Sequence, residues 1–246
     1  MTRKRANIAA DTDMLNHILT SFAHFTALPF GKLKNIPEDC KAKVFDFWSL
    51  VGWFTGGSMA IVYILASRFV SHPVALMLAI TARIAVTAGR EEKGLKTLSA
   101  KAGIDGSIVL IVYFLLMFIT LKELPSIWLP WLMISGDCLS KYCASFSVDI
   151  LKPNSDGTDR YDKKSVATII AGTLFGFAPL LLTLPEMFWI VGFAPIITST
   201  LLHCTMSMRQ HRFCNGNEGA IFLISELTFY IAAHSLIFTN SLQQHL

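Results

Sequence analysis

Hydrophobic residues in this chain gather in seven long runs that polar segments separate. The runs cover residues 47–70, 73–88, 106–121, 125–148, 166–184, 185–203 and 220–238. Most of them approach the roughly 20 residues that an α-helix needs to cross the hydrocarbon of a bilayer. Inside lipid, a helix satisfies its own backbone hydrogen bonds, and the strict apolar–polar alternation of a β-barrel is absent. The pattern predicts an all-α, polytopic integral membrane helical bundle.

Two of the runs leave the number of transmembrane helices at six or seven. Residues 73–88 are short for a complete span. Residues 125–148 carry Asp137 and Lys141, and ionisable groups inside a bilayer are costly unless they are paired or face a polar cavity.

The segment before the first run divides into two parts. Residues 1–13 are polar and basic, and we expect them to be a disordered arm without a cleavable signal peptide. Residues 14–28 place apolar side chains at helical spacing, which predicts an amphipathic helix lying in the membrane interface. Residues 14–246 are expected to form a single membrane domain, since the chain has no internal repeat or linker-like segment.

The composition supports a membrane protein. The chain is 53% apolar, has a mean hydropathy of +0.51, and is 15% charged, whereas charged residues make up about 25% of a typical soluble domain. The net charge of +4 is too diffuse to indicate a nucleic-acid partner. It favours contact with anionic lipid headgroups or with a phosphorylated substrate.

Basic residues lie almost entirely on one side of the runs. If the N-terminus is cytoplasmic and every run crosses the bilayer, 17 of the 21 lysines and arginines fall in cytoplasmic segments. This asymmetry follows the positive-inside rule and predicts that the N-terminus is cytoplasmic. The long connections, residues 89–105, 152–165 and 204–219, share that side. Because function concentrates on loops carried by a rigid scaffold, we expect the polar chemistry there.

Asp137 and Lys141 are spaced i, i+4 and therefore share one face of a helix. One interpretation is a neutralising pair at the inner end of a tilted helix. The other is a phosphate-binding lysine that its neighbouring carboxylate holds in place.

Glu226 stands inside the last run, and Arg83 is the one cation well inside another run. A buried carboxylate needs a partner. A structural Arg83–Glu226 pair and a contact from Glu226 to a metal or substrate are both open interpretations.

A glycine-rich turn, residues 214–220, leads into the last run and contains Asn217, Glu218 and Gly219. Helix N-termini favour anions, although glycine and asparagine are also ordinary turn residues. Asp105 precedes the third run, where it is either a helix cap or a ligand. Glu91 and Glu92 lie beside Arg90 and Lys93, and we interpret them as a solvated face.

Four segments of the chain resemble the cobalamin synthase family, the adenosylcobinamide-GDP ribazoletransferases. Residues 25–30 (FTALPF) are similar to the opening segment of that family, residues 48–57 to its first span, residues 136–145 to its mid-chain helix, and residues 219–227 to the end of its C-terminal glycine-rich signature. The resemblance extends from about Met14 to Ile237.

The resemblance implies a magnesium-dependent phosphotransferase of the bacterial inner membrane. Such an enzyme joins α-ribazole or its 5′-phosphate to adenosylcobinamide-GDP and releases GMP. Magnesium would be the cofactor, membrane lipid the surroundings, and a homo-oligomer is compatible with the pattern. The residues expected to serve this chemistry are Asp137 and Glu226 in catalysis, Lys141, Asn217 and Gly219 in substrate binding, and Asp105 and Glu218 at the metal.

The chain also departs from the family pattern. The acidic stretch between the second and third spans is missing, because residues 86–89 (VTAG) run directly into residues 90–95 (REEKGL). Ala100 and Ala27 stand where the family has an aspartate and an arginine. Magnesium prefers oxygen ligands, carboxylates among them. The alternative hypothesis is therefore an inactive or altered relative that acts as a non-enzymatic membrane binding or assembly protein.

Overall fold

The computed structural model describes residues 2–29, 38–151, 161–210 and 216–243, and every regular element in these ranges is a helix. The helices are α1 (Thr2–Phe25), α3 (Glu38–Lys41), α4 (Trp48–Ala66), α5 (His72–Thr87), α6 (Arg90–Lys101), α7 (Gly106–Glu123), α8 (Leu129–Ala144), α9 (Ser147–Ile150), α10 (Val166–Thr183), the 3₁₀ helix η1 (Glu186–Gly192), α11 (Phe193–Gln210) and α12 (Asn217–Gln243). The prediction of an all-α polytopic bundle is confirmed.

Short polar residues begin several of these helices. The Asp105 carboxylate accepts a hydrogen bond from the Ser107 amide at 2.7 Å and caps α7. The Ser165 hydroxyl accepts one from the Thr168 amide at 3.2 Å and caps α10. Each cap satisfies a backbone donor that has no partner within the helix.

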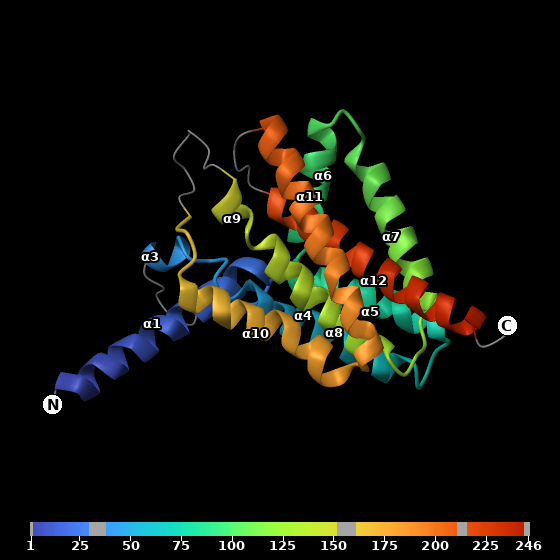
Figure 1. Ribbon diagram of the computed structural model, residues 1–246, viewed down its shortest axis with the longest axis horizontal. Coiled ribbons are helices and arrows are strands. Elements are labelled where there is room, and N and C mark those ends of the chain that lie inside the picture. Colours follow the sequence, from blue (N-terminus) through green and yellow to red (C-terminus); the bar gives the residue numbers. More distant parts are fainter. Residues whose placement is uncertain (1, 30–37, 152–160, 211–215, 244–246) are drawn as a thin grey trace.

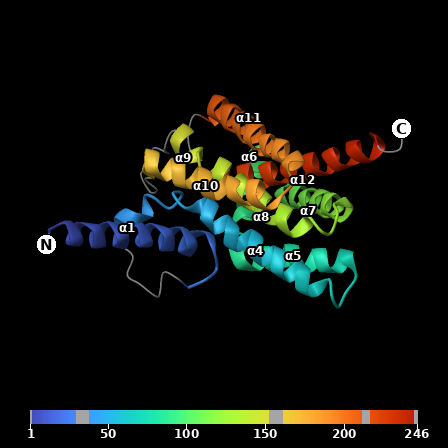
Figure 2. The ribbon, with the colours of Figure 1, turned by 60° about the horizontal axis from the view of Figure 1, so that its bottom comes forward.

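Helix α8 lies at the centre of the bundle. Figures 1 and 2 show it between α4 on one side and α10, α11 and α12 on the other. Most of its side chains are buried. The run that contains Asp137 and Lys141 therefore forms an interior helix. Burying these two charged side chains there is tolerable only if other protein groups pair with them or hydrogen-bond to them.

Glycines allow α4 to approach α8 closely. A Cβ atom on Gly52 would lie 2.7 Å from Cys138 Cα, and one on Gly56 would lie 3.0 Å from Asp137 Cβ. This Gly-x-x-x-Gly spacing brings backbones together as in many packed membrane helices. The contact fixes the depth of Asp137 relative to α4.

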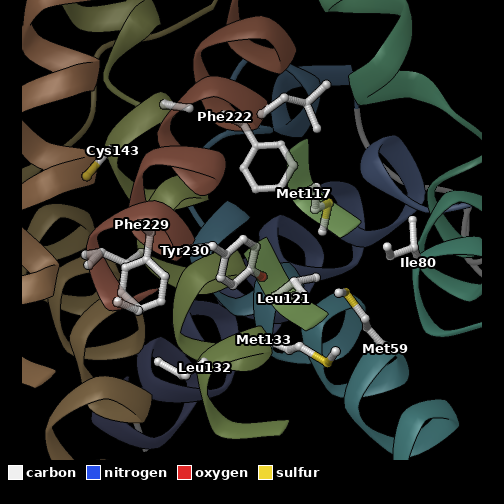
Figure 3. Close-up of a cluster of buried hydrophobic side chains, with 14 of the residues drawn as sticks. Met59, Ile80, Met117, Leu121, Leu132, Met133, Cys143, Phe222, Phe229 and Tyr230 are labelled. Atoms are coloured by element: carbon white, nitrogen blue, oxygen red, sulfur yellow. The ribbon is translucent and has the colours of Figure 1, made fainter. Parts of the chain in front are cut away.

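The apolar core is formed around α8 and α12. Figure 3 shows Phe222, Phe229 and Tyr230 of α12 with Met117, Leu121 and Met133 in one cluster. Outside this cluster, α7 exposes a stripe that includes Ile108, Ile111 and Leu115, each more than half exposed. Such a stripe suits contact with lipid.

Five segments are long and apolar enough to cross a membrane: α4, α7, α10, residues 186–208 and α12 within residues 217–240. Helices α5 and α6 are bent by 87° relative to each other. If this pair counts as one span, the number of candidate spans rises to six. Six agrees with the lower of the two predicted counts. Helix α8 is not one of these candidates, because it has only 16 residues and most of them are buried inside the protein.

Helix α1 begins earlier than the sequence analysis expects. It starts at Thr2 and so includes the basic arm that was predicted to be disordered, and it ends at Phe25 within the predicted segment 14–28. Alanine, arginine and lysine in the arm are strong helix formers, which gives a physical reason for the difference. In Figure 1, the N-terminal half of α1 extends away from the bundle.

Candidate functional site

Lys141 and Asp137 form a buried ion pair on α8, and Thr55 of α4 completes it. Lys141 Nζ donates to Asp137 Oδ1 and also to Thr55 Oγ1 at 2.8 Å. The Thr55 hydroxyl lies 3.0 Å from each oxygen of the Asp137 carboxylate. The predicted i, i+4 pair is therefore present, and the close α4–α8 contact supplies its third member.

Glu226 and Arg83 form a second buried ion pair, between α12 and α5. Arg83 Nη1 donates to Glu226 Oε2, and the hydroxyl of Tyr113 on α7 donates to the same oxygen at 2.9 Å. Tyr230 donates to the other oxygen, Oε1, at 3.0 Å. Side chains of three helices, α5, α7 and α12, thus converge on one carboxylate, and the structural pair that the sequence left open is observed.

The ring of Phe222 lies near the cations of both pairs. It lies 4.3 Å from Lys141 Nζ and 5.7 Å from Arg83 Cζ, measured to the ring centroid. Both distances fall within the range of cation–π attraction. Phe222 therefore contacts both cations.

A sharp bend between α5 and α6 brings two more carboxylates to this place. Ala88 and Gly89 both adopt left-handed backbone conformations, with φ of 54° and 63°. Glycine adopts this conformation at no steric cost, whereas alanine is strained in it. The chain turns here by 87° and directs the first turn of α6 back against the bundle.

Glu91 and Glu92 occupy that first turn and are buried, with 2% and 6% of their surface exposed. Glu91 Oε1 lies 3.1 Å from Lys141 Nζ, and Glu92 Oε1 lies 3.7 Å from Arg83 Nη2. These are ion-pair distances without hydrogen-bond geometry, and none of the four carboxylate oxygens has a hydrogen-bond partner among the described residues. The interpretation of Glu91 and Glu92 as a solvated face is wrong, because the bend turns them inward.

The start of α12 packs against the same turn of α6. A Cβ atom on Gly219 would lie 2.8 Å from the Glu91 carbonyl oxygen, so only glycine fits without displacement. Asn217 is buried, and its amide nitrogen has no hydrogen-bond partner among the described residues. Glu218 accepts hydrogen bonds from the Gly216 amide at 3.0 and 3.1 Å and so closes the turn.

Asp105 is not brought to this place. It lies beyond the far end of α6, and the helix rises by roughly 15 Å between Glu91 and Lys101. Its side chain is exposed and caps α7, and the hydrogen bond from the Ser107 amide lowers the pKa of its carboxyl. Of the two predicted metal ligands, Asp105 thus caps α7, and Glu218 accepts hydrogen bonds from the Gly216 amide in the turn before α12.

We refer to Arg83, Glu91, Glu92, Asp137, Lys141 and Glu226 as the buried charge network. Five helices, α5, α6, α8 and α12 with Thr55 of α4, build it. Its cations could neutralise the charge of a phosphorylated substrate, and its carboxylates could hold those cations, accept a proton or bind a metal ion. Within the described residues, no group of three or more His, Cys, Asp or Glu side chains is arranged to hold a metal ion.

Sequence reasoning missed Thr55, Tyr113 and Tyr230 as members of this site, and it misplaced Glu91 and Glu92. For Glu91 a signal exists: together with Leu95 and Ser99 it recurs every four residues on one face of α6, and all three are buried. Hydroxyl groups inside apolar helices give no comparable signal, because their partners lie on other helices.

A separate polar cluster lies where the segment before α10 meets α9. The Lys164 amide donates to Asp149 Oδ1 at 3.0 Å, and its ammonium donates to Ser145 Oγ. The ammonium also lies 4.4 Å from the centre of the Phe146 ring. Burial lowers the pKa of Lys164 to about 8, while the nearby Asp149 carboxylate acts in the opposite direction.

Known proteins resemble the chain over most of its length. A family model described as cobalamin-5-phosphate synthase matches residues 17–96 and 99–234. Three curated proteins named adenosylcobinamide-GDP ribazoletransferase are similar. The one from Shewanella pealeana is 29% identical over 175 residues, covering 62% of this chain and 67% of that protein.

The matches to the other two relatives are shorter. The protein from Shewanella halifaxensis is 30% identical, and the match covers 53% of this chain and 59% of that protein. The protein from Clostridium novyi is 24% identical, and the match covers 45% of this chain and 51% of that protein. This chain thus spans between half and two thirds of the relatives it matches. No solved structure matches it. Because the family model covers nearly the whole bundle, including all six residues of the buried charge network, the chain belongs to the cobalamin-5-phosphate synthase family.

Proposed function

We propose that this protein transfers the cobinamide phosphate of adenosylcobinamide-GDP to α-ribazole or its 5′-phosphate and releases GMP. The observation that carries the proposal is the family match, which spans both halves of the buried charge network. The names of the three relatives support the same activity and give no support to a non-enzymatic alternative.

The reaction exchanges one phosphorus–oxygen bond for another. A ribose hydroxyl oxygen attacks the phosphorus next to cobinamide, the bond from that phosphorus to GMP breaks, and the hydroxyl proton leaves to a base. Little covalent chemistry is required of the protein, so positioning and charge stabilisation carry most of the catalysis. A group of fixed cations and carboxylates in a site with little water suits this task.

In this proposal Lys141 and Arg83 supply positive charge toward the diphosphate. Asp137 and Glu226, which the sequence analysis expects to be catalytic, hold these cations through their ion pairs. Asn217 contributes an amide donor that has no hydrogen-bond partner among the described residues, at the start of α12, where a helix N-terminus favours phosphate oxygens. Gly219 keeps that turn close to α6.

Magnesium is part of the proposal because the family resemblance implies it. When bound, the ion would neutralise charge on the diphosphate. The described residues that fit it best are Glu91 and Glu92, whose buried carboxylate oxygens have no hydrogen-bond partner. Asp105 and Glu218 fit less well, because backbone amides already occupy their carboxylates.

We also propose that the protein lies in the bacterial inner membrane with its N-terminus and long connections in the cytoplasm. When all seven apolar runs, α8 included, are counted as crossing the bilayer, 17 of the 21 lysines and arginines fall on the cytoplasmic side, which supports this orientation. The outward apolar stripe on α7 supports contact with lipid. A homo-oligomer remains compatible with this arrangement.

The test is a direct assay of the purified protein in detergent. Adenosylcobinamide-GDP, α-ribazole 5′-phosphate and magnesium are added, and GMP is measured by chromatography. Release of GMP that depends on both organic substrates is the expected result. A folded protein that binds adenosylcobinamide-GDP but releases no GMP would contradict the proposal and favour a binding protein.

A further inference from the structure

The two cations of the buried charge network have no access to solvent in this structure. The side chains of Arg83 and Lys141 are both fully buried. Each of them faces two carboxylates, one from α8 or α12 and one from the first turn of α6. The diphosphate of the proposed substrate therefore reaches these cations only after a carboxylate on each of them has moved away.

The two carboxylates of α6 are held less firmly than those of α8 and α12. Asp137 and Glu226 each accept hydrogen bonds from at least two side chains. Glu91 and Glu92 lie 3.1 and 3.7 Å from their cations, and none of their four oxygens has a hydrogen-bond partner among the described residues. Charge-assisted hydrogen bonds are the stronger contacts, so a competing anion displaces the α6 carboxylates first.

Glu91 and Glu92 also match a diphosphate in charge. A diphosphate that links two alcohols carries one negative charge on each phosphoryl group, as two neighbouring carboxylates do. Each of the two glutamates faces its own cation, and both cations contact the ring of Phe222. Exchange of the two carboxylates for the two phosphoryl groups leaves the total buried charge unchanged. It therefore avoids the large cost of burying additional charge.

Helix α6 has a glycine in a left-handed conformation at each end. Gly89 precedes its first residue with φ of 63°, and Gly103 follows its last turn with φ of 77°. A Cβ atom on Gly103 would meet no other atom within 4 Å, so that position has room to change conformation. Ala88, beside Gly89, is strained at φ of 54°. Strain of this kind clusters in switch regions and ligand clamps.

We infer that the first turn of α6 is an autoinhibitory lid, in which Glu91 and Glu92 occupy the places of the two phosphoryl groups of the substrate. The diphosphate displaces both carboxylates from Lys141 and Arg83 while α6 turns about Gly89. This inference rests on the proposed function, because it takes these two cations as the groups that meet the diphosphate.

Binding of inorganic pyrophosphate tests the competition. Purified protein in detergent, with EDTA to remove divalent cations, is titrated with pyrophosphate in a calorimeter. The Glu91→Gln/Glu92→Gln double variant should bind pyrophosphate about tenfold more tightly than the wild type, the gain expected when the open form is about a tenth of the wild-type population. Glu186→Gln, at an exposed glutamate, is the matched control and should leave the affinity unchanged.

Thiol labelling tests the movement of α6. Ser99 lies on the buried face of this helix, and Thr97 lies on its exposed face. Ser99→Cys should react slowly with a maleimide, and saturating pyrophosphate should raise that rate severalfold. Thr97→Cys is the matched control, whose rate should not change. Mass spectrometry of peptides separates the introduced thiol from the native cysteines.

Two results would overturn the inference. One is a double glutamine variant that binds pyrophosphate no more tightly than the wild type. The other is a Ser99→Cys labelling rate that does not change in a protein to which pyrophosphate binds. If the double variant does not fold, the labelling of Ser99→Cys in the otherwise native chain decides the question.

The outcome is separable from that of the proposed function. GMP release together with an unchanged Ser99→Cys labelling rate would remove the lid and leave the transferase activity. Opening of α6 by pyrophosphate in a protein that releases no GMP would do the reverse.

Discussion

Lys141 on α8 lies 3.1 Å from Glu91 on α6, and this contact joins the centre of the bundle to the helix that follows the 87° bend. Lys141 also pairs with Asp137 on its own helix. One ammonium thus serves two carboxylates from distant parts of the chain.

Replacing Lys141 with methionine should destabilise the protein strongly. The change keeps the apolar stem but leaves Asp137 buried without its cation, and breaking a buried pair in this way costs about 3–5 kcal/mol. Adding Asp137→Asn should restore part of the loss. Unfolding in detergent, followed by intrinsic fluorescence, measures both effects. A Lys141→Met variant as stable as the wild type, but unable to bind adenosylcobinamide-GDP, would assign Lys141 to the substrate alone.

Arg83 and Glu226 should be strongly coupled in a double-mutant cycle. Arg83→Met and Glu226→Gln each leave one charge unpaired in a fully buried place, so each should be destabilising by about 3–5 kcal/mol. The double variant should lose clearly less than the sum, because neither charge remains. The cycle uses the free energy of unfolding in detergent. Simple additivity of the two single changes would speak against a mutually dependent pair.

The bend between α5 and α6 predicts opposite effects at two neighbouring positions. Gly89→Ala places a side chain at φ of 63° and should lower stability by about 1 kcal/mol. The added methyl meets no atom closer than 3.9 Å, so the effect is one of backbone strain. Ala88→Gly should be neutral or stabilising, since it relieves the same strain at φ of 54°. Thermal unfolding checks both, and a more stable Gly89→Ala variant would show that Gly89 is not held in a left-handed conformation.

Lys164 should react with amine reagents at a lower pH than an ordinary lysine. Burial lowers its pKa to about 8, so the reactive neutral amine should reach half of its maximum there. In the protein unfolded in SDS, the midpoint should move to about 10.4. Asp149→Asn removes a carboxylate that favours the charged amine, so the midpoint should fall below that of the wild type. Acetylation of Lys164, followed by mass spectrometry across pH, tests the direction, and a rise after Asp149→Asn would contradict it.

The orientation of the protein can be tested by labelling single cysteines in intact bacterial cells, in a cysteine-free background. Lys163→Cys, in a predicted cytoplasmic connection, should react only with a membrane-permeant maleimide. Phe69→Cys, at a residue 86% exposed after α4, should react with an impermeant one. The reversed pattern would invert the proposed topology.

The sequence by itself determined the helical elements and their membrane character. The seven apolar runs coincide with α4, α5, α7, α8, α10, the segment of η1 and α11, and α12. Asp105 and Ser165 cap their helices because capping depends on neighbouring residues alone. The i, i+4 spacing of Asp137 and Lys141 was equally local, and their pairing followed from it.

Only the tertiary structure decided which charges meet and which are buried. Glu91 and Glu92 stand in a polar, basic stretch, and the four-residue spacing of Glu91, Leu95 and Ser99 does not by itself show which elements would cover that face. Their burial depends on two left-handed residues that turn the chain by 87° and bring α6 against α12 and α7. Burial is a property of elements packed together across the chain, whereas periodicity is a property of a single element, and this is why the composition of the network could not be predicted from the sequence.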